Sequence, residues 1–513
     1  MFKMQEKMKL IKTWLVFALL LGCILTVFAF SVGLGATDEP QLAPINLHFI
    51  GQQQQQDQSD LAPIKSLLQQ KQSLATEQTQ TQGRPLGYRP PLFDTSYLSR
   101  LETTSESSLA LQKKSYPASY DLRSLGKVTS VKDQANCGAC WAFATYGSLE
   151  SCLLPTESRD FSENNLKNTH GFDWAWDTGG NAFMSAAYLT RWSGPINETD
   201  DPYNDANGDS PTGLTVQKHV QEIILLPDSD KNAIKNAIMT YGAVTTSMCW
   251  DGEIVDAIFN SNTNAYWNFV SKDWTLSGEN HGLNHMVTIV GWDDTYSKKN
   301  FLQCPSKSAG SPVGYPAGDG AWIVKNSWGT SFGNQGYFYV SYYDQNFAHE
   351  LVVFMNAEST EDYQHQYEYD TYGLQQGFGF PKSKTANTAW ASNVFYATAN
   401  EPLVAVAFYA LAPKTQYSIS VYTNVDGSSN NPTKGTLVSE ASTSGTIAYA
   451  GYHTIKLPAP VQLTTGQKFS IVVKLTTPGY TFPIPIEVRQ VGLGIHSPDE
   501  DYTSNATSNA GES

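Results

Sequence analysis

The hydrophobic pattern changes near residue 356, and this change limits the possible folds more than any other feature. Before it, from about residue 116, helix-like and strand-like stretches are mixed. After it, apolar and polar residues alternate in short segments such as 404–409, 417–422 and 469–474, with Gly-, Asn- and Pro-rich turns between them. A chain of 513 residues is also too long for one hydrophobic core. The sequence therefore predicts an α+β domain over residues 116–356 and an all-β sandwich over residues 357–513.

Three helices are predicted in the first of these domains. One begins at Cys140, and Pro155 ends it because proline cannot continue a helix. The other two cover residues 182–192 and 228–241, and Asp228 and Ser229 are candidate caps of the last one.

The N-terminus has the pattern of an export signal. Four lysines precede an apolar run over residues 14–30, and small residues follow at 33–36. We predict that residues 1–36 are a signal peptide or an N-terminal anchor, so that the protein is secreted, extracellular or at the cell surface. Membrane contact is expected only through this segment, if it is retained. Residues 37–115 are rich in Gln, Ser and Thr, which predicts a low-complexity pro-segment that is largely extended or mobile.

The net charge of the chain and the spacing of its possible metal ligands argue against several classes of function. The chain has 48 acidic and 33 basic residues, a net charge of −15, so a nucleic-acid partner is not expected. No group of His, Cys, Asp and Glu has the spacing of a metal site. The sequence therefore predicts no metal and no cofactor.

The cysteine count indicates a reactive thiol. Cys23 leaves with a cleaved signal, and the five remaining cysteines are an odd number for an exported chain. Cys140 is the candidate for the reactive thiol. The other four could form two disulfides, and the sequence leaves the pairing open among Cys137, Cys152, Cys249 and Cys304.

Cys140 is predicted to lie at the start of a helix, where the helix would favour the thiolate form of its side chain. A cysteine in the first turn of a helix faces unpaired N–H groups and the positive end of the helix dipole, and both favour the nucleophilic thiolate. Gly138 precedes it and would let a substrate backbone approach. The side-chain amide of Gln134 and the N–H group of Cys140 could donate hydrogen bonds to an oxyanion.

Two further segments supply a base and a residue that orients it. His285 begins the apolar run 286–292, so a sheet can hold its imidazole at one end. Asn326 follows the apolar run 321–324, and its amide oxygen can accept a hydrogen bond from the imidazole. Trp328 could cover that hydrogen bond and exclude water from it.

These blocks resemble a known family. The run Cys137-Gly138-Ala139-Cys140-Trp141, the blocks around His285 and Asn326, and the tail 328–337 are similar to papain-like cysteine peptidases. The segments 88–91, 363–373, 450–454 and 475–480 resemble the prokaryotic type with a C-terminal lectin-like domain. The resemblance implies a two-lobe fold, with a helical lobe and a β-barrel-like lobe on either side of a cleft.

The resemblance also implies a substrate site. Gly179 and Gly180 match the glycine pair whose backbone aligns the substrate in this family. The pocket for the second residue before the scissile bond would be medium-sized and mostly apolar, and its lining would be Asn181, Ala182, Ser247 and Met286.

The chain departs from the family pattern in three places. No cysteine precedes the glycine pair, so Cys137 lacks the disulfide partner that the family usually supplies. The pro-segment lacks a long helical pattern, so self-inhibition by a helical pro-segment is not predicted. The chain ends at Ser513, where relatives of this type tend to continue, which suggests a C-terminal sandwich truncated at its last strand.

The sequence predicts a cysteine endopeptidase that hydrolyses polypeptide substrates through an acyl-enzyme. One alternative is a surface binding or adhesion protein with a weakly active or inactive peptidase fold, whose C-terminal domain holds a cell-surface glycan or the cell wall. Another is acyl transfer to an amine instead of to water. Thiol labelling, glycan binding and product analysis would separate the three.

Overall fold

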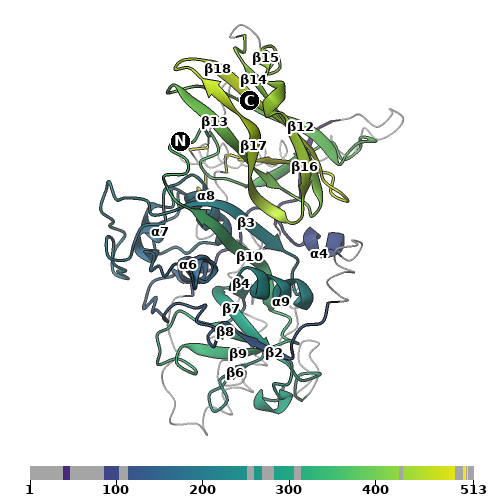
Figure 1. The fold of residues 1–513 in the computed structure, drawn as a ribbon. Helices are drawn as coiled ribbons and strands as arrows, with labels where there is room; N and C mark the ends of the chain where they lie inside the picture. Colours follow the sequence, from purple (N-terminus) through teal and green to yellow (C-terminus); the bar gives the residue numbers. More distant parts are fainter. Residues whose placement is uncertain are drawn as a thin grey trace, which may run out of the picture.

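The computed structural model describes residues 39–46, 86–102, 114–250, 259–268, 282–304, 314–426, 431–490, 501–503 and 505–506. Figure 1 shows a lower part, formed by the middle of the chain, and an upper part formed by its C-terminal third. The predicted signal or anchor lies outside the described residues, as do residues 47–85. Within the ranges just given, no helix is both long and apolar enough to cross a bilayer.

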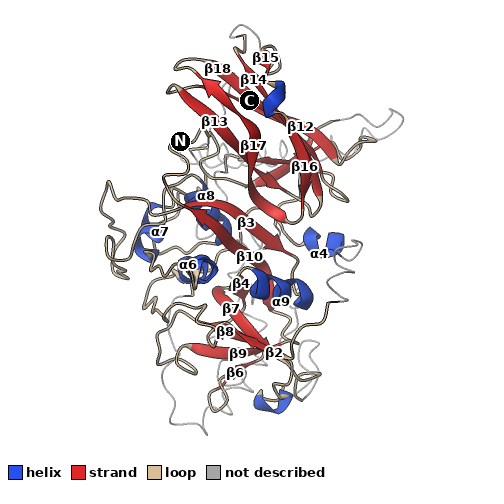
Figure 2. Cartoon of the chain, in the orientation of Figure 1, coloured by secondary structure: helices blue, strands red, loops and turns tan. Residues whose placement is uncertain are grey.

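The lower part contains both helices and strands. Its helices are α6 (Cys140–Leu153), α7 (Glu163–Thr169), α8 (Ala182–Thr190), α9 (Lys231–Thr240) and the short 3₁₀ helix η4 (Lys298–Asn300). Its strands are β2 (Ser119–Asp121), β3 (His219–Leu226), β4 (Val244–Met248), β5 (Phe259–Asn260), β6 (Ala265–Tyr266), β7 (His285–Asp293), β8 (Ala321–Lys325), β9 (Tyr337–Ser341) and β10 (Phe347–Glu358). In the lower part, helices α6, α7 and α8 lie together on one side of strands β4 and β7, and α9 lies on the other side, as Figure 2 shows. This arrangement confirms the predicted α+β class with a helical and a β-rich lobe.

Helix α6 begins and ends where the sequence predicts. It is buried from Cys140 to Ser151, and polar members such as Ser148 and Glu150 form hydrogen bonds with other parts of the protein. The prediction for α9 was wrong at its start. Asp230 caps this helix by accepting hydrogen bonds from the N–H groups of Asn232 and Ala233, while Asp228 bonds elsewhere.

The sheet brings two segments of the chain to one end. β7 lies between β4 and β8, and both pairings are antiparallel. Thr288 in β7 is opposite Lys325, the last residue of β8. His285, which begins β7, and Asn326, which follows β8, therefore lie at the same end of neighbouring strands.

The upper part is the predicted β-sandwich. One layer contains β12 (Thr388–Tyr396), β14 (Thr415–Thr423), β15 (Thr436–Leu437), β16 (Thr443–Ile447) and β18 (Lys468–Thr476), and η5 (Ser439–Ala441) follows β15. The other layer is the pair β13 (Glu401–Ala410) and β17 (Ala450–Leu463). The two layers enclose an apolar core to which Phe395, Val406, Ile419, Val461 and Phe469 belong.

The two parts share one sheet. β17 pairs with β3 of the lower part, from Ala450 opposite Leu225 to His453 opposite Glu222. The order β13-β17-β3-β10-β4-β7-β8-β9 thus runs from the sandwich to the active-site strands without interruption. The pattern of the sequence does not predict this continuity.

Residues 39–46 and 86–102, which the sequence predicts to belong to a pro-segment, pack along both parts. β1 (Gln41–Leu42) pairs with β11 (Gln376–Gly379), which also pairs with β19 (Ile484–Ile486). Residues 86–93 are extended, and helix α4 (Tyr97–Glu102) follows them. The ring of Tyr97 stacks on Tyr480 with a centroid distance of 4.0 Å.

Candidate active site

Cys140 occupies the first turn of α6 and is fully buried. Its Sγ accepts a hydrogen bond from the backbone N–H of Met286 at 3.3 Å, so the sulfur lies against the start of β7. Burial raises the pKa of the Cys140 thiol to about 12, whereas hydrogen bonds from the backbone of Met286 and Trp141 lower it. In this state the thiol is protonated at neutral pH.

His285 and Asn326 form the hydrogen bond that the sequence predicts, between Nε2 and Oδ1 at 2.8 Å. The same Oδ1 accepts from the N–H of Ser327 at 2.8 Å, which fixes the orientation of the amide. Because an amide oxygen can only accept, Nε2 must carry a proton in the neutral ring, and Nδ1 is left as the base. Nδ1 is buried without a hydrogen bond of normal geometry, and the backbone of Leu86 lies close enough to the ring to raise the pKa of His285. Burial lowers the pKa of His285 to about 4, and the bond to Asn326 opposes that shift.

Trp328 covers the imidazole of His285. The two rings are stacked, with centroids 4.7 Å apart and planes 20° from parallel. Trp328 is itself buried among aromatic rings that include Trp250 and Phe332. Its indole therefore excludes water from the face of the imidazole that it covers.

Gln134 is held with its amide nitrogen toward the cleft. Oε1 accepts a hydrogen bond from Ser327 Oγ at 2.6 Å, so Nε2 points the other way. Nε2 donates to the carbonyl oxygen of Cys137 at 2.9 Å, and the carbonyl oxygen of Leu86 lies 3.4 Å from it. A carbonyl oxygen of the pro-segment thus occupies the side of Gln134 where a substrate oxygen is expected.

The extended residues 86–93 of the predicted pro-segment lie along the candidate site. Gly180 donates from its N–H to the carbonyl of Gly87 and accepts at its carbonyl from the N–H of Arg89, each at 2.9 Å. The N–H of Tyr88, between them, donates to the carbonyl of Asn284 at 3.1 Å. Tyr88 and Gly180 form a parallel bridge. The sequence predicts no self-inhibition by a helical pro-segment, and the residues that lie along the site are extended and not helical.

Glycines make this close approach possible. A Cβ atom on Gly87 would lie 2.1 Å from the carbonyl oxygen of Gly138, and one on Gly179 would lie 2.4 Å from the carbonyl oxygen of Gly87. Both residues also have positive φ angles, +92° and +104°. A Cβ atom on Gly180 would lie 2.6 Å from the ring of Trp141. Gly179 therefore lies directly against the backbone of Gly87, and Gly180 packs against the ring of Trp141.

The residues that the resemblance places in the side-chain pocket lie in different surroundings. Ala182 and Met286 are buried in the same apolar cluster as Tyr88. Asn181 instead caps α8, where its oxygen accepts from the N–H groups of Phe183 and Met184. Ser247 and Glu350 supply polar groups next to the Tyr88 hydroxyl. The mostly apolar character of this pocket stays a prediction, and Glu350, directly before the apolar run 351–354, is a polar neighbour that the sequence reasoning did not include.

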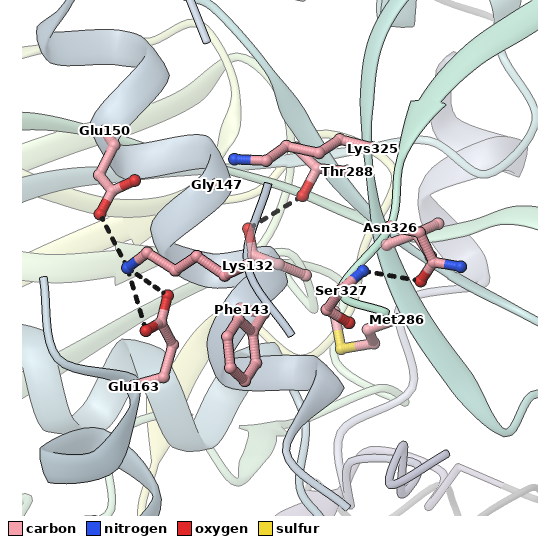
Figure 3. Close-up of a pocket in the computed structure, with 12 residues that line it drawn as sticks. Lys132, Phe143, Gly147, Glu150, Glu163, Met286, Thr288, Lys325, Asn326 and Ser327 are labelled. Atoms are coloured by element: carbon pink, nitrogen blue, oxygen red, sulfur yellow. Dashed lines mark hydrogen bonds and ion pairs between the residues drawn. The ribbon is translucent and has the colours of Figure 1, made fainter. Parts of the chain in front are cut away.

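A second pocket lies behind Asn326 and holds buried charges (Figure 3). Lys132 contacts Glu163 on α7 at 2.8 Å and Glu150 on α6 at 3.7 Å. Thr129 Oγ1 donates to Glu150 at 2.5 Å and accepts from Lys325 Nζ at 3.2 Å. These contacts tie α6, which carries Cys140, to β8, which leads into Asn326.

The described cysteines form no disulfide. Cys137, Cys140, Cys152, Cys249 and Cys304 are all thiols, so the two predicted disulfides are not present. Cys137 lies in a small apolar cluster with Ala139 and Phe143, beside Trp176 and Tyr203. Packing by these aromatic rings takes the place of the disulfide that the family resemblance implies.

Comparison with known proteins agrees with this geometry. A model of papain family cysteine proteases matches residues 116–355, and a model of a lectin-like domain matches residues 366–513. The viral cathepsin of Antheraea pernyi nuclear polyhedrosis virus is 32% identical over 265 residues, which cover 48% of this chain and 70% of the viral protein. The chain belongs to the papain family of cysteine proteases.

Other papain-family relatives match a smaller share of their own length. The viral cathepsin of Choristoneura fumiferana defective polyhedrosis virus is 34% identical over 228 residues, which are 44% of this chain and 59% of that relative. The chain thus spans less than two thirds of that relative.

A solved structure covers nearly the whole of this papain-family chain. The cysteine protease and lectin-like domains of Cwp84, a surface layer associated protein of Clostridium difficile, align with a TM-score of 0.64 at 22% identity, covering 94% of this chain and 92% of that one. A variant of the clostridial cysteine protease Cwp84, solved after propeptide cleavage, aligns with a TM-score of 0.56 at 26% identity, covering 72% of this chain and 91% of that one. The first comparison confirms the two-part fold.

Proposed function

We propose that this chain is the precursor of a secreted or surface-attached cysteine endopeptidase. Residues 1–36 direct export or anchor the chain, residues 37–115 are the pro-segment, residues 116–356 are the peptidase, and residues 357–513 form the lectin-like domain. The hydrogen bond between His285 and Asn326 at 2.8 Å, next to a cysteine at a helix N-terminus, is the observation that supports the activity.

The proposed reaction begins when Cys140 gives its proton to Nδ1 of His285 and its sulfur attacks the substrate carbonyl. A C–S bond forms, and the oxygen takes the negative charge between Gln134 Nε2 and the N–H of Cys140. Collapse breaks the C–N bond while His285 protonates the leaving amine. His285 then deprotonates a water molecule that attacks the acyl-enzyme, and the C–S bond breaks. Asn326 keeps Nε2 protonated throughout.

Activation requires that residues 86–93 leave the cleft. While they are bound, Cys140 is buried and its pKa is near 12. Their removal would expose the sulfur to water, and the helix N-terminus would then favour the thiolate. The pro-segment thus keeps the peptidase inactive by occupying its cleft and by raising the pKa of its nucleophile.

Labelling with an epoxysuccinyl peptide tests the proposal. We expect one adduct on Cys140 after the pro-segment has been cleaved, and this adduct should abolish peptide cleavage. Cys140→Ala should take no adduct and should not cleave peptides. An added amine acceptor should leave the hydrolysis products unchanged. If the cleared, folded protein takes no adduct, the adhesion alternative with an inactive peptidase fold replaces this proposal.

We further propose that the C-terminal domain binds an acidic cell-surface glycan. The strands β12, β14, β15, β16 and β18 contain no Asp or Glu, although the chain has 48 acidic residues. Trp390 is 63% exposed on the outer face of this layer, and Lys474 Nζ lies 5.0 Å from its ring centroid. The layer therefore has a cationic aromatic site in an otherwise acidic molecule.

The strand register surrounds Trp390 with uncharged polar groups. Ser418 and Ser444 follow Lys474 across the sheet in one row. Thr388, Thr476 and Gln416 form the next row. A sugar ring has an apolar C–H face that can stack on an indole and a rim of hydroxyls that can bond to such side chains. Lys474 adds a charge for a carboxylate or phosphate on the glycan.

Affinity electrophoresis of the complete chain tests this second proposal. We expect polygalacturonate, a polymer of uronic acids, to retard the protein more than neutral dextran does. Trp390→Ala should abolish the retardation. Tyr343→Ala is the matched control, because Tyr343 is an exposed ring under a lysine in the peptidase part. Equal retardation of the wild type and of Trp390→Ala would overturn the proposal.

A further inference from the structure

A second free thiol lies three residues before Cys140. The family resemblance implies a disulfide at Cys137, but no cysteine directly precedes the glycine pair, and Cys137 is unbonded among the described cysteines. Both side chains are buried, with 1% of Cys137 and none of Cys140 exposed. The proposed cleavage reaction uses Cys140 and leaves Cys137 without a part in it.

The chain between the two cysteines forms a tight turn of small residues. The N–H of Ala139 donates to the carbonyl oxygen of Cys137 at 2.8 Å, which closes a three-residue turn centred on Gly138. Helix α6 begins at Cys140, directly after this turn. Two cysteines with this spacing at the start of a helix can interconvert between the dithiol and disulfide forms.

The two thiols influence each other's charge. Burial raises the pKa of the Cys140 thiol, and a negative charge on Cys137 raises it further, so the two side chains lie within electrostatic reach of each other. Burial also raises the pKa of the Cys137 thiol to about 11, while the charge of Lys167 and the hydroxyl of Tyr203 lower it. Cys137 is therefore protonated at neutral pH and does not react first with an oxidant.

A fixed cation lies beside Cys137 and would stabilise its thiolate. Lys167 Nζ donates to Asn168 Oδ1 at 2.8 Å and to the carbonyl oxygen of Asn207 at 3.0 Å. It also lies 4.6 Å from the centroid of the Trp176 ring, next to which Cys137 packs. The positive charge is thus in place before Cys137 loses its proton.

The predicted pro-segment locks the turn in the precursor. A Cβ atom on Gly87 would lie 2.1 Å from the carbonyl oxygen of Gly138, so the segment 86–93 rests directly on the turn. Cys137 Sγ itself is held loosely, because its contact with the carbonyl oxygen of Trp176 is 3.8 Å long and a thiol is a weak donor. Departure of the segment would free the turn to move and would uncover Cys140.

We propose that Cys137 is the redox partner of Cys140, and that a peroxide links the two in the activated enzyme. The Cys140 thiolate attacks hydrogen peroxide, so that an S–O bond forms, the O–O bond breaks and hydroxide leaves. The product is a sulfenic acid on Cys140. This inference rests on the proposed function, which supplies the uncovered thiolate.

The second step closes the disulfide. The hydroxide takes the proton of Cys137, and the resulting thiolate attacks the Cys140 sulfur, so that an S–S bond forms and the S–O bond breaks. The hydroxide that leaves takes the proton that His285 had accepted from Cys140. Two thiols and one peroxide thus give one disulfide and two water molecules. The enzyme is inactive in this form, but a thiol reductant restores it, whereas a sulfinic acid on Cys140 would be permanent.

Peroxide treatment of the activated enzyme tests this inference. The enzyme would be treated with hydrogen peroxide, quenched with catalase, and assayed for peptide cleavage before and after dithiothreitol. Non-reducing mass spectrometry would follow the same samples. We expect activity to be lost together with about 2 Da, the mass of the two hydrogen atoms, from the peptide that contains both cysteines. Dithiothreitol should restore most of the activity. The precursor should stay reduced under the same treatment.

Cys137→Ser should lose activity without forming the disulfide. Its Cys140 should gain about 32 Da as a sulfinic acid, and dithiothreitol should restore about tenfold less of its starting activity than in the wild type. Cys152→Ser is the matched control, because it removes another free thiol from α6. It should form the disulfide and recover as the wild type does.

A wild-type enzyme whose Cys140 is oxidised without a bond to Cys137 would overturn the inference. Equal recovery of the wild type and of Cys137→Ser would do the same. The mass of the wild type decides the question even if Cys137→Ser does not fold. If the untreated enzyme takes no epoxysuccinyl label and cleaves no peptide, the proposed function fails, whereas the mass after peroxide still shows whether the disulfide forms.

Discussion

At the scale of single residues, orientation of the polar groups matters more than their presence. Gln134 can offer Nε2 to the cleft because Ser327 Oγ donates to its Oε1. Asn326 can hold His285 because the N–H of Ser327 fixes Oδ1 toward the imidazole. Ser327 thus positions both the proposed oxyanion donor and the residue that we propose orients the base.

Gln134→Ala should lower kcat of the activated enzyme by about 100- to 1,000-fold, because one donor to the oxyanion is lost in the transition state. KM should change little, since the ground-state carbonyl is bound mainly by backbone groups. Steady-state kinetics with a peptide that the activated enzyme cleaves would measure both constants. An unchanged kcat would mean that Gln134 does not contact the oxyanion.

The Cys140 thiol should react slowly in the precursor. With a pKa of about 12, its thiolate fraction at pH 8 is about one in 10,000, and it should rise about tenfold per pH unit. We expect the rate of alkylation of Cys140 by iodoacetamide to climb through pH 10 without a plateau. The activated enzyme should reach a plateau at a much lower pH. Identical profiles for the two forms would contradict this explanation of latency.

At the scale of elements, the extended segment 86–93 and the buried charges each hold two elements together. The segment bonds to Gly180 at the start of α8 and to Asn284 before β7. The charges join α6 to β8 on the other side of Asn326. The two lobes are therefore coupled both in front of the active site and behind it.

Gly87→Val should release the pro-segment and speed activation. A Cβ atom at this position would clash with the backbone of Gly138, and φ is +92°. The mature enzyme would be unchanged, because residue 87 is removed with the pro-segment. The measurement is the rate at which Cys140 of the precursor takes up the epoxysuccinyl label. Gly126→Val is the control, since Gly126 also has positive φ but has no atom within 4 Å of its Cβ position.

Lys132→Met should destabilise the protein by about 3–5 kcal/mol, because it leaves the buried Glu150 and Glu163 without their cation. Urea unfolding followed by tryptophan fluorescence would measure the loss. Lys434→Met removes an exposed ion pair with Asp426 and should cost at most about 1 kcal/mol. Similar losses for the two variants would argue against a role of burial.

At the scale of the whole molecule, the sandwich and the peptidase share a sheet, so we expect them to unfold together. Gly451 lies at the joint, where a Cβ atom would come 1.9 Å from the carbonyl oxygen of Ile223. The complete chain should show one calorimetric transition. Gly451→Val should lower its midpoint or split it in two. Two independent transitions in the wild type would mean that the β17–β3 pairing contributes little.

The sequence by itself determined the features that depend on local chemistry. Cys140 could be predicted as the nucleophile because a helix start and a proline stop can be recognised in a short stretch. His285 and Asn326 could be predicted because each lies at one end of an apolar run. The two-part organisation followed from the change of periodicity near residue 356.

Only the tertiary structure decided which distant segments meet. Periodicity indicates which face of a strand is buried, but it does not indicate the neighbouring strand, so the pairing of β17 with β3 could not be predicted. The same holds for Glu350, which β10 brings next to the hydroxyl group of Tyr88, and for the segment 86–93, whose polar backbone gives no periodic signal. A contact between residues far apart in sequence depends on the packing of every element between them, and no local pattern records it.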